Sequence, residues 1–207
     1  MRRFLFVAAI SLAVLGLGAC ADRAEPQASG HPSLIIVRDF AAPLGVVTLD
    51  PSFGFSLRRG EAGVPPAQRG ASVARAAVFT LADTVVEQLR AYGYDAVRSN
   101  EAGPEPGGRA LVVTGAFRSI NEGYRRRVGA EGSNVAVDAE IEFQAQGGAP
   151  RRLMAFQLDS RQAPREGTEG VSARREPINA AVGRVGAYIA RATLELARHN
   201  NWPGAPR

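Results

Sequence analysis

Three carboxylate side chains, Asp138, Glu140 and Glu142, alternate with apolar residues in the segment VAVDAEIEF. On a β-strand, alternate residues share one face and lie about 6.5–7 Å apart. Paired carboxylates at such separations can cleave a glycosidic bond, one as the acid and the other as the base or nucleophile. A solvated strand face accounts for the same residues without any chemistry, and we favour that interpretation.

Three consecutive arginines, Arg125, Arg126 and Arg127, stand among glycines in the segment 120–134, INEGYRRRVGAEGSN. Glycines permit positive φ and allow backbone amides to face an anion, and the arginine fork matches phosphate and carboxylate oxygens. One interpretation is a loop that binds anionic lipid head groups or another envelope protein with an acidic surface. The other, which we favour, is a solvated connection between two strands, and the spacing matches no nucleotide-binding motif.

Metal and nucleophile chemistry has few candidate residues in this chain. The two histidines, His31 and His199, are distant in the sequence, and Cys20 is the only cysteine. A zinc site needs three or four His, Cys or carboxylate ligands, and the sequence contains no Gly-x-Ser-x-Gly nucleophile elbow. We therefore expect no metal and no cofactor, and we predict that the protein is not an enzyme. The alternative is a periplasmic cell-wall glycan hydrolase that uses the strand carboxylates.

The first twenty residues, MRRFLFVAAISLAVLGLGAC, have the form of an export signal. Their uncharged run is shorter than the roughly 18–20 residues of a membrane-spanning helix. Leu17-Gly18-Ala19-Cys20 resembles the bacterial lipobox, which implies that the chain is cut before Cys20 and that the thiol is acylated. A plain secretory signal with an incidental cysteine is the weaker alternative.

Acylation of Cys20 would make the membrane a partner through the N-terminal acyl chains. Ala21, directly after the cysteine, favours the outer membrane with the domain on the periplasmic face, and Asp22 leaves retention in the inner membrane as the alternative. The formal charge is +5, and all 25 basic residues are arginine. Nucleic acid is not an expected partner in the periplasm.

The elements that would position these residues follow from the hydrophobic periodicity. Leu34 to Val37 predicts a first strand, and the Gly- and Pro-rich stretch 41–68 predicts a long irregular excursion. Strand-like fragments occur within that excursion at 46–49 and 53–57.

A helical pattern begins at Ser72, where apolar residues recur every three or four positions, and Gly93 is suited to end that helix. The segments predicted as strands after it are 94–97, 111–117, 135–143 and 154–158. The last three are expected to pair as an antiparallel meander. A final helix is predicted after Pro177, with a continuous apolar stripe from Ile178 to Leu196.

Together these elements predict an α+β fold in β-α-β-β-β-α order. It would hold a mixed, largely antiparallel sheet of four to five strands with two helices packed on one face. The predicted organisation is a signal peptide at 1–19, a lipidated cysteine with a flexible tether at 20–33, one domain at 34–200 and a C-terminal tail at 201–207.

A family resemblance rests on short motifs distributed over residues 34–200. They are Val37 to Phe40, Leu111 to Gly115, Asn121-Glu122-Gly123, Arg127, Gly129, Gly132 and Ser133. In this order they resemble the bacterial lipoprotein family of domain of unknown function 4410. The resemblance implies an exported, lipid-anchored α/β domain and brings no catalytic residues. We therefore expect a periplasm-facing envelope protein that acts as a binding or assembly component.

Overall fold

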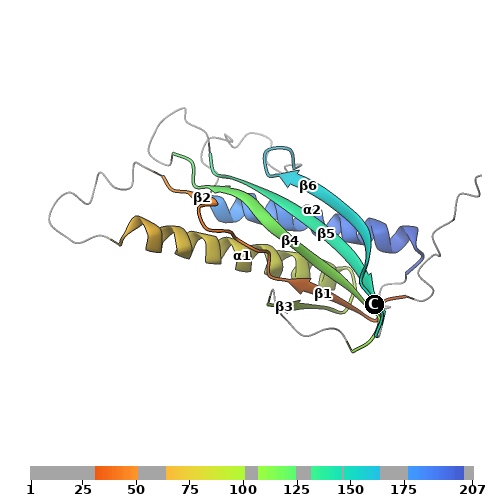
Figure 1. The fold of residues 1–207 in the computed structure, drawn as a ribbon. Coiled ribbons are helices and arrows are strands. Elements are labelled where there is room, and N and C mark those ends of the chain that lie inside the picture. Colours follow the sequence, from red (N-terminus) through yellow and green to blue (C-terminus); the bar gives the residue numbers. More distant parts are fainter. Residues whose placement is uncertain are drawn as a thin grey trace, which may run out of the picture.

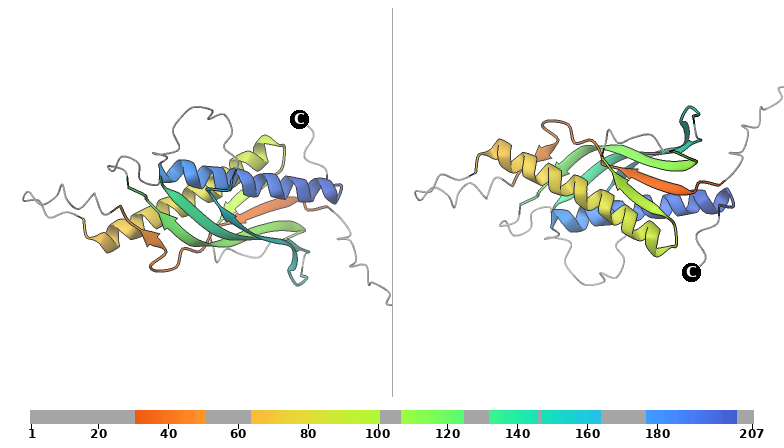
Figure 2. Two further views of the ribbon diagram at one scale, coloured as in Figure 1. Left: turned by 90° about the horizontal axis from the view of Figure 1, so that it is seen from above. Right: turned by 90° about the horizontal axis from the view of Figure 1, so that it is seen from below.

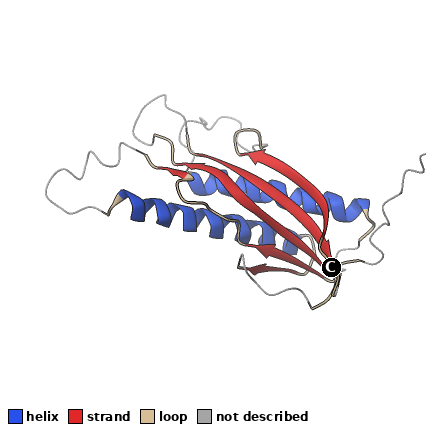
Figure 3. Cartoon of the chain, viewed as in Figure 1, coloured by secondary structure: helices blue, strands red, loops and turns tan. Residues whose placement is uncertain are grey.

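The structure is a computed structural model that describes residues 31–50, 64–100, 107–124, 132–145, 147–163 and 177–202. Within these residues the chain forms six strands and two helices (Figures 1 and 3). Their bounds are β1 Leu34–Arg38, β2 Val47–Thr48, α1 Pro66–Ala91, β3 Ala96–Ser99, β4 Ala110–Asn121, β5 Asn134–Gln144, β6 Arg151–Asp159 and α2 Ile178–His199.

The strands form one mixed sheet in the order β3-β1-β4-β5-β6, with β2 paired to the far end of β4. β1 is parallel to both β3 and β4, whereas β4, β5 and β6 form the predicted antiparallel meander. The α+β class, the mixed sheet and its two covering helices are thus confirmed. The sheet has six described strands instead of four to five, because the two-residue β2 adds to it.

The sequence predicted a strand at 94–97 without deciding its direction, and the structure decides it. β3 is an edge strand parallel to β1, with Ile35 opposite Ala96. The 26 residues of α1 return the chain to the end of the sheet where β1 began, so the next strand runs in the same direction as β1.

Both helices cover the same face of the sheet, as the two views in Figure 2 show. On that face, alternate residues of β4 and β5 enter the core, among them Leu111, Val113, Val137 and Ile141, all fully buried. The opposite face carries the polar residues of the same strands. This alternation is the expected consequence of the two-residue period of a strand.

α1 and α2 pack against one another at a glycine. A Cβ atom at Gly186 of α2 would lie 2.9 Å from the Cβ of Thr84 and 3.2 Å from the carbonyl oxygen of Leu81 on α1. The absence of a side chain at Gly186 therefore allows the two helices to approach closely. α1 begins at Pro66, six residues before the predicted Ser72, because proline suits the first turn of a helix.

The hydrophobic core extends from Ile35 to Trp202. Trp202, two residues past the predicted domain boundary, is 5% exposed and stacks on Phe143 at a ring-centroid distance of 5.9 Å. Its carbonyl oxygen accepts a hydrogen bond of 3.2 Å from the hydroxyl of Tyr94. The residues after α2 therefore contribute to the core.

Candidate functional site

The described residues enclose a groove between the N-terminal half of α1 and the segment that leads from β1 to β2. Its volume is about 760 Å³, and its walls come from residues 39–49 and 66–78. Pockets that hold small ligands have volumes of about 300–1,000 Å³. The groove is therefore large enough for an organic ligand.

The groove exists because one face of α1 carries small residues. Ala67, Gly70, Ala71 and Ala74 line it from the helix, and a Cβ atom at Gly70 would meet nothing within 4 Å. Most of these small residues precede Ser72, where the helix was predicted to begin, so the periodicity gave no sign of the groove. They leave a space that the facing segment does not fill.

The facing wall is also apolar, with Phe40, Pro43, Leu44 and Val47 among its residues. Leu44 is fully exposed at the edge of the groove, next to Gly45, whose φ of 83° makes the turn that begins the approach to β2. A large apolar side chain in full contact with water is costly in free energy. An apolar ligand in the groove would remove part of that cost.

Asp39 and Arg75 are the two charged residues that line the groove. The guanidinium of Arg98 donates hydrogen bonds of 2.6 and 3.1 Å to the two carboxylate oxygens of Asp39. Arg98 also donates a hydrogen bond of 3.0 Å to Asp83, and its guanidinium carbon lies 4.2 Å from the ring centroid of Phe79. The hydrogen bond with Asp39 is the main reason why the pKa of Arg98 is raised.

This ion-pair network fixes one end of the groove. Asp39 follows β1, Asp83 belongs to α1 and Arg98 belongs to β3. The two ion pairs of Arg98 therefore join three segments that are distant in the sequence. The remaining charged residue of the groove, Arg75, has an exposed side chain on α1. The groove therefore combines an apolar lining with an exposed cation.

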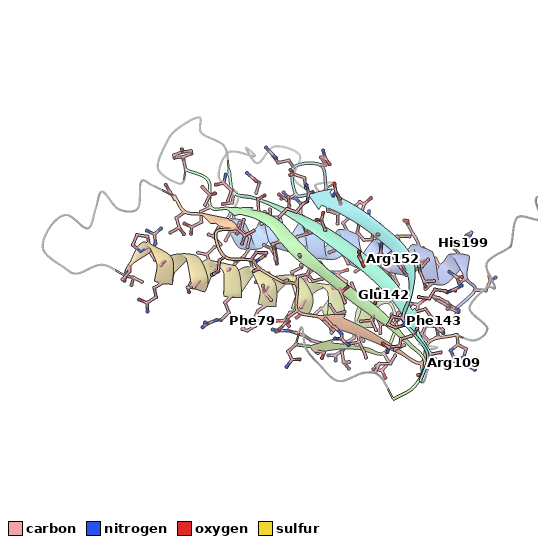
Figure 4. All side chains as sticks on the ribbon, in the orientation of Figure 1. Phe79, Arg109, Glu142, Phe143, Arg152 and His199 are labelled. Carbon is pink, nitrogen blue, oxygen red and sulfur yellow. The ribbon has the colours of Figure 1, made fainter. Side chains whose placement is uncertain are left out.

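The three carboxylates of the sequence analysis lie together on the sheet face that the helices do not cover. Asp138 pairs with Arg118 of β4 at 2.9 Å, and Glu140 pairs with Arg152 of β6 at 3.3 Å. Glu142 is opposite Arg152 in the ladder between β5 and β6, as Figure 4 shows. Two of the carboxylates thus take part in cross-strand ion pairs, as on a solvated sheet face.

A second, smaller recess lies beside these carboxylates. It has a volume of about 330 Å³ and is lined by Arg38, Asp39, Thr114, Gly115, Ala116, Asp138 and Glu140. Gly115 belongs to β4, and a Cβ atom there would lie 2.4 Å from the ring of Phe40. Phe40 therefore covers this glycine from the core side.

The three predicted arginines at 125–127 lie outside the described residues, and so does Cys20. The base of the arginine segment is described. Ser133 donates a hydrogen bond of 2.7 Å to the carbonyl of Glu122, and the carboxylate of Glu122 accepts one of 3.1 Å from the backbone of Asp50. Glu122 also lies 3.5 Å from Arg69 in the first turn of α1. The segment therefore begins and ends beside the start of α1, where the groove begins.

The histidines are not brought into a common site. His31 is exposed before β1, and His199 is exposed at the last residue of α2. Within the described ranges, no group of three or more His, Cys, Asp or Glu side chains is placed to hold a metal ion. Neither α1 nor α2 is apolar enough over a sufficient length to cross a bilayer.

No family model matches the sequence, and no curated protein matches it. One similar solved structure is a protein of the DUF330 family from Xanthomonas campestris, 14% identical, with a TM-score of 0.41; the match covers 84% of this chain and 93% of that one. Another is a homologue of a neuraminyllactose-binding hemagglutinin from Helicobacter pylori, 13% identical, with a TM-score of 0.42; it covers 82% and 92%. Neither likeness identifies a family for this chain.

Proposed function

We propose that the protein is a lipid-anchored, periplasm-facing component of the cell envelope that binds the apolar chain of an amphiphile in the groove beside α1. The observation that supports this proposal is the size and lining of the groove. Its volume is about 760 Å³, and all but two of its lining residues are uncharged. Burial of apolar surface contributes about 25 cal/mol per Å². A hydrocarbon chain is the ligand that such a lining stabilises best.

The expected lipid anchor would keep the domain close to a membrane. An acyl group on Cys20 and a tether of about a dozen residues would hold the domain within about 20 Å of a bilayer surface. Amphiphiles are abundant there. Arg75 at the edge of the groove is suited to the anionic head group that such a molecule carries.

The arginines at 125–127 stay a prediction as an additional contact for an anionic head group or an acidic partner. Their segment begins at Glu122, whose carboxylate lies 3.5 Å from Arg69, the residue that precedes Gly70 of the groove. The described residues before and after the arginines, Glu122 and Ser133, therefore lie near the start of α1.

We propose a role without catalysis. Asp138 and Glu140 are each engaged by an arginine, and neither residue lines the groove. Hydrolysis of cell-wall glycans through these carboxylates and Glu142 has no supporting observation beyond their spacing.

Binding can be measured with a fluorescent fatty acid as the probe and with residues 21–207, which include the whole core. Gly70→Leu places a side chain in the groove where a Cβ meets nothing within 4 Å, so the fold is expected to persist and probe binding to be lost. Gly183→Leu is the matched control, because a Cβ at this glycine of α2 also meets nothing within 4 Å and the residue does not line the groove. Absence of binding by the unaltered chain, or equal binding by the Gly70→Leu variant, would contradict the proposal.

A further inference from the structure

Strand β6 is an edge of the sheet. Among the described residues it pairs only with β5, and Figure 1 shows it at the margin of the sheet. Half of the backbone N–H and C=O groups of an antiparallel edge strand point away from its single neighbour. Natural edges are commonly protected by proline, charges or bulges. The bulge and the charges of β6 lie at its start, and Met154 to Leu158 are five consecutive uncharged residues without proline.

The core is incompletely covered along this edge. Met154 and Phe156 lie on the helix-covered side, opposite Ile141 and Ala139 of β5. Ile141 and Ala139 are buried, whereas Met154 and Phe156 are only partly buried against the core. A further strand beside β6 would cover both side chains.

The sequence of β6, RRLMAFQLD, is complementary to itself when it is read in the antiparallel direction. With Phe156 opposite its own copy, Met154 lies opposite Leu158 and Ala155 lies opposite Gln157. Residues directly opposite in an antiparallel ladder share a face. The three apolar residues then meet on the core side, and Ala155 and Gln157 meet on the open side.

A bulge at the start of β6 also fits this register. The pairing with β5 passes from Met154 opposite Ile141 to Arg152 opposite Glu142, so β6 carries one extra residue at Leu153. The bulge brings Arg152 to the open face, which is also the face of Asp159, since Asp159 lies opposite Ala136. Arg152 of one strand, which pairs with Glu140 of its own chain, would then lie opposite Asp159 of the other, which pairs with Arg161.

We propose that two copies of this chain associate through β6, antiparallel and about a two-fold axis at Phe156. The two sheets would become one continuous sheet with all four helices on the same face. The matching apolar residues favour a second copy over a foreign peptide, because the strand is complementary to itself: Phe156 lies opposite its own copy and Met154 lies opposite Leu158. This inference is independent of ligand binding in the groove.

The register can be tested with two single-cysteine variants of residues 21–207, a chain that has no cysteine of its own. Ala155→Cys and Gln157→Cys both replace exposed residues on the open face of β6. In the proposed dimer a cysteine at 155 lies opposite one at 157, about 4.5–5.5 Å away between Cα atoms. Two cysteines at the same position lie diagonally, about 7–8 Å apart, which exceeds the usual span of a disulfide.

Under mild oxidation, a mixture of the two variants is expected to form the mixed disulfide in large excess over either self-disulfide. Sedimentation of the unaltered chain is expected to show a dimer. A monomer at every concentration, without the mixed disulfide, would overturn the proposal and would leave a foreign strand as the occupant of this edge. Self-disulfides as abundant as the mixed one would refute the register.

Discussion

Arg98 shows how single residues connect elements that the sequence treats separately. Its guanidinium contacts Asp39, Asp83 and the ring of Phe79, which belong to the end of β1 and to α1. The two carboxylates form ion pairs with the guanidinium, and the aromatic ring makes a cation–π contact with it. In sequence these four residues have no common pattern, so only the packing of β3 beside β1 reveals that they form one cluster.

Asp159 supports a prediction about pH. The side chain of Arg161 donates hydrogen bonds of 3.1 and 2.8 Å to it, and this contact is the main reason why the pKa of Asp159 is lowered. A carboxyl group with a lower pKa in the folded state stabilises the fold above its unfolded pKa. That contribution is lost as the pH falls through the folded value.

Asp159→Asn is therefore expected to reduce the free energy of unfolding near pH 7 by about 0.5 kcal/mol, since Arg161 is largely exposed. Once the pH has fallen below the lowered pKa of Asp159, where both states carry a protonated carboxyl, the variant and the unaltered chain should become equal. Urea unfolding at the two pH values checks this, with Glu87→Gln, an exposed carboxylate of α1, as the control. A difference that persists in acid would refute the ion-pair explanation.

At the scale of elements, the contact between α1 and α2 depends on the absence of a side chain at Gly186. A leucine there would collide with Thr84 and with the carbonyl of Leu81. Overpacking of this kind costs about 1–3 kcal/mol, so Gly186→Leu should lower the free energy of unfolding by about 2 kcal/mol.

Gly183, one turn earlier on the same helix, supplies the control for that prediction. A Cβ at this position meets nothing within 4 Å, so Gly183→Ala should raise stability by about 0.5–1 kcal/mol through helix propensity alone. Both variants can be compared by urea unfolding. If Gly186→Leu were as stable as Gly183→Ala, the close approach of the helices would be wrong.

For the whole molecule, the anchor at Cys20 is the property on which the proposed location depends. Cys20→Ser removes the thiol that would be acylated, so the protein is expected to leave the membrane fraction of the cell envelope. Fractionation followed by mass spectrometry of the N-terminus measures this directly. Recovery of the serine variant with the membranes, or an unacylated mature cysteine in the unaltered protein, would contradict lipid anchoring.

Loss of the anchor and loss of the groove are separable outcomes. A Cys20→Ser protein that leaves the membrane but binds the fatty-acid probe would retain the binding function. A Gly70→Leu protein that stays on the membrane without binding the probe would retain the location. The two experiments therefore test different parts of the proposed function.

Much of the fold followed from local periodicity, because a half-buried strand and an amphipathic helix each repeat their burial pattern along the chain. The meander of β4, β5 and β6 and the helix after Pro177 are confirmed in this way. The carboxylates of β5 were also placed correctly on one face, since alternation decides the side of a strand without reference to other elements. The lipobox motif is equally local, and lipidation of Cys20 stays a prediction.

Tertiary structure decided what depends on pairs of distant segments. The parallel position of β3, the stacking of Trp202 on Phe143 and the Asp39–Arg98–Asp83 cluster join residues whose separation in the chain carries no signal. The groove is of the same kind: small residues on α1 become a cavity only because the segment from β1 to β2 faces them. The buried face of a helix or strand can be predicted from the periodicity of its own sequence. A cavity cannot be predicted in this way, because its existence depends on how two separate segments pack against each other.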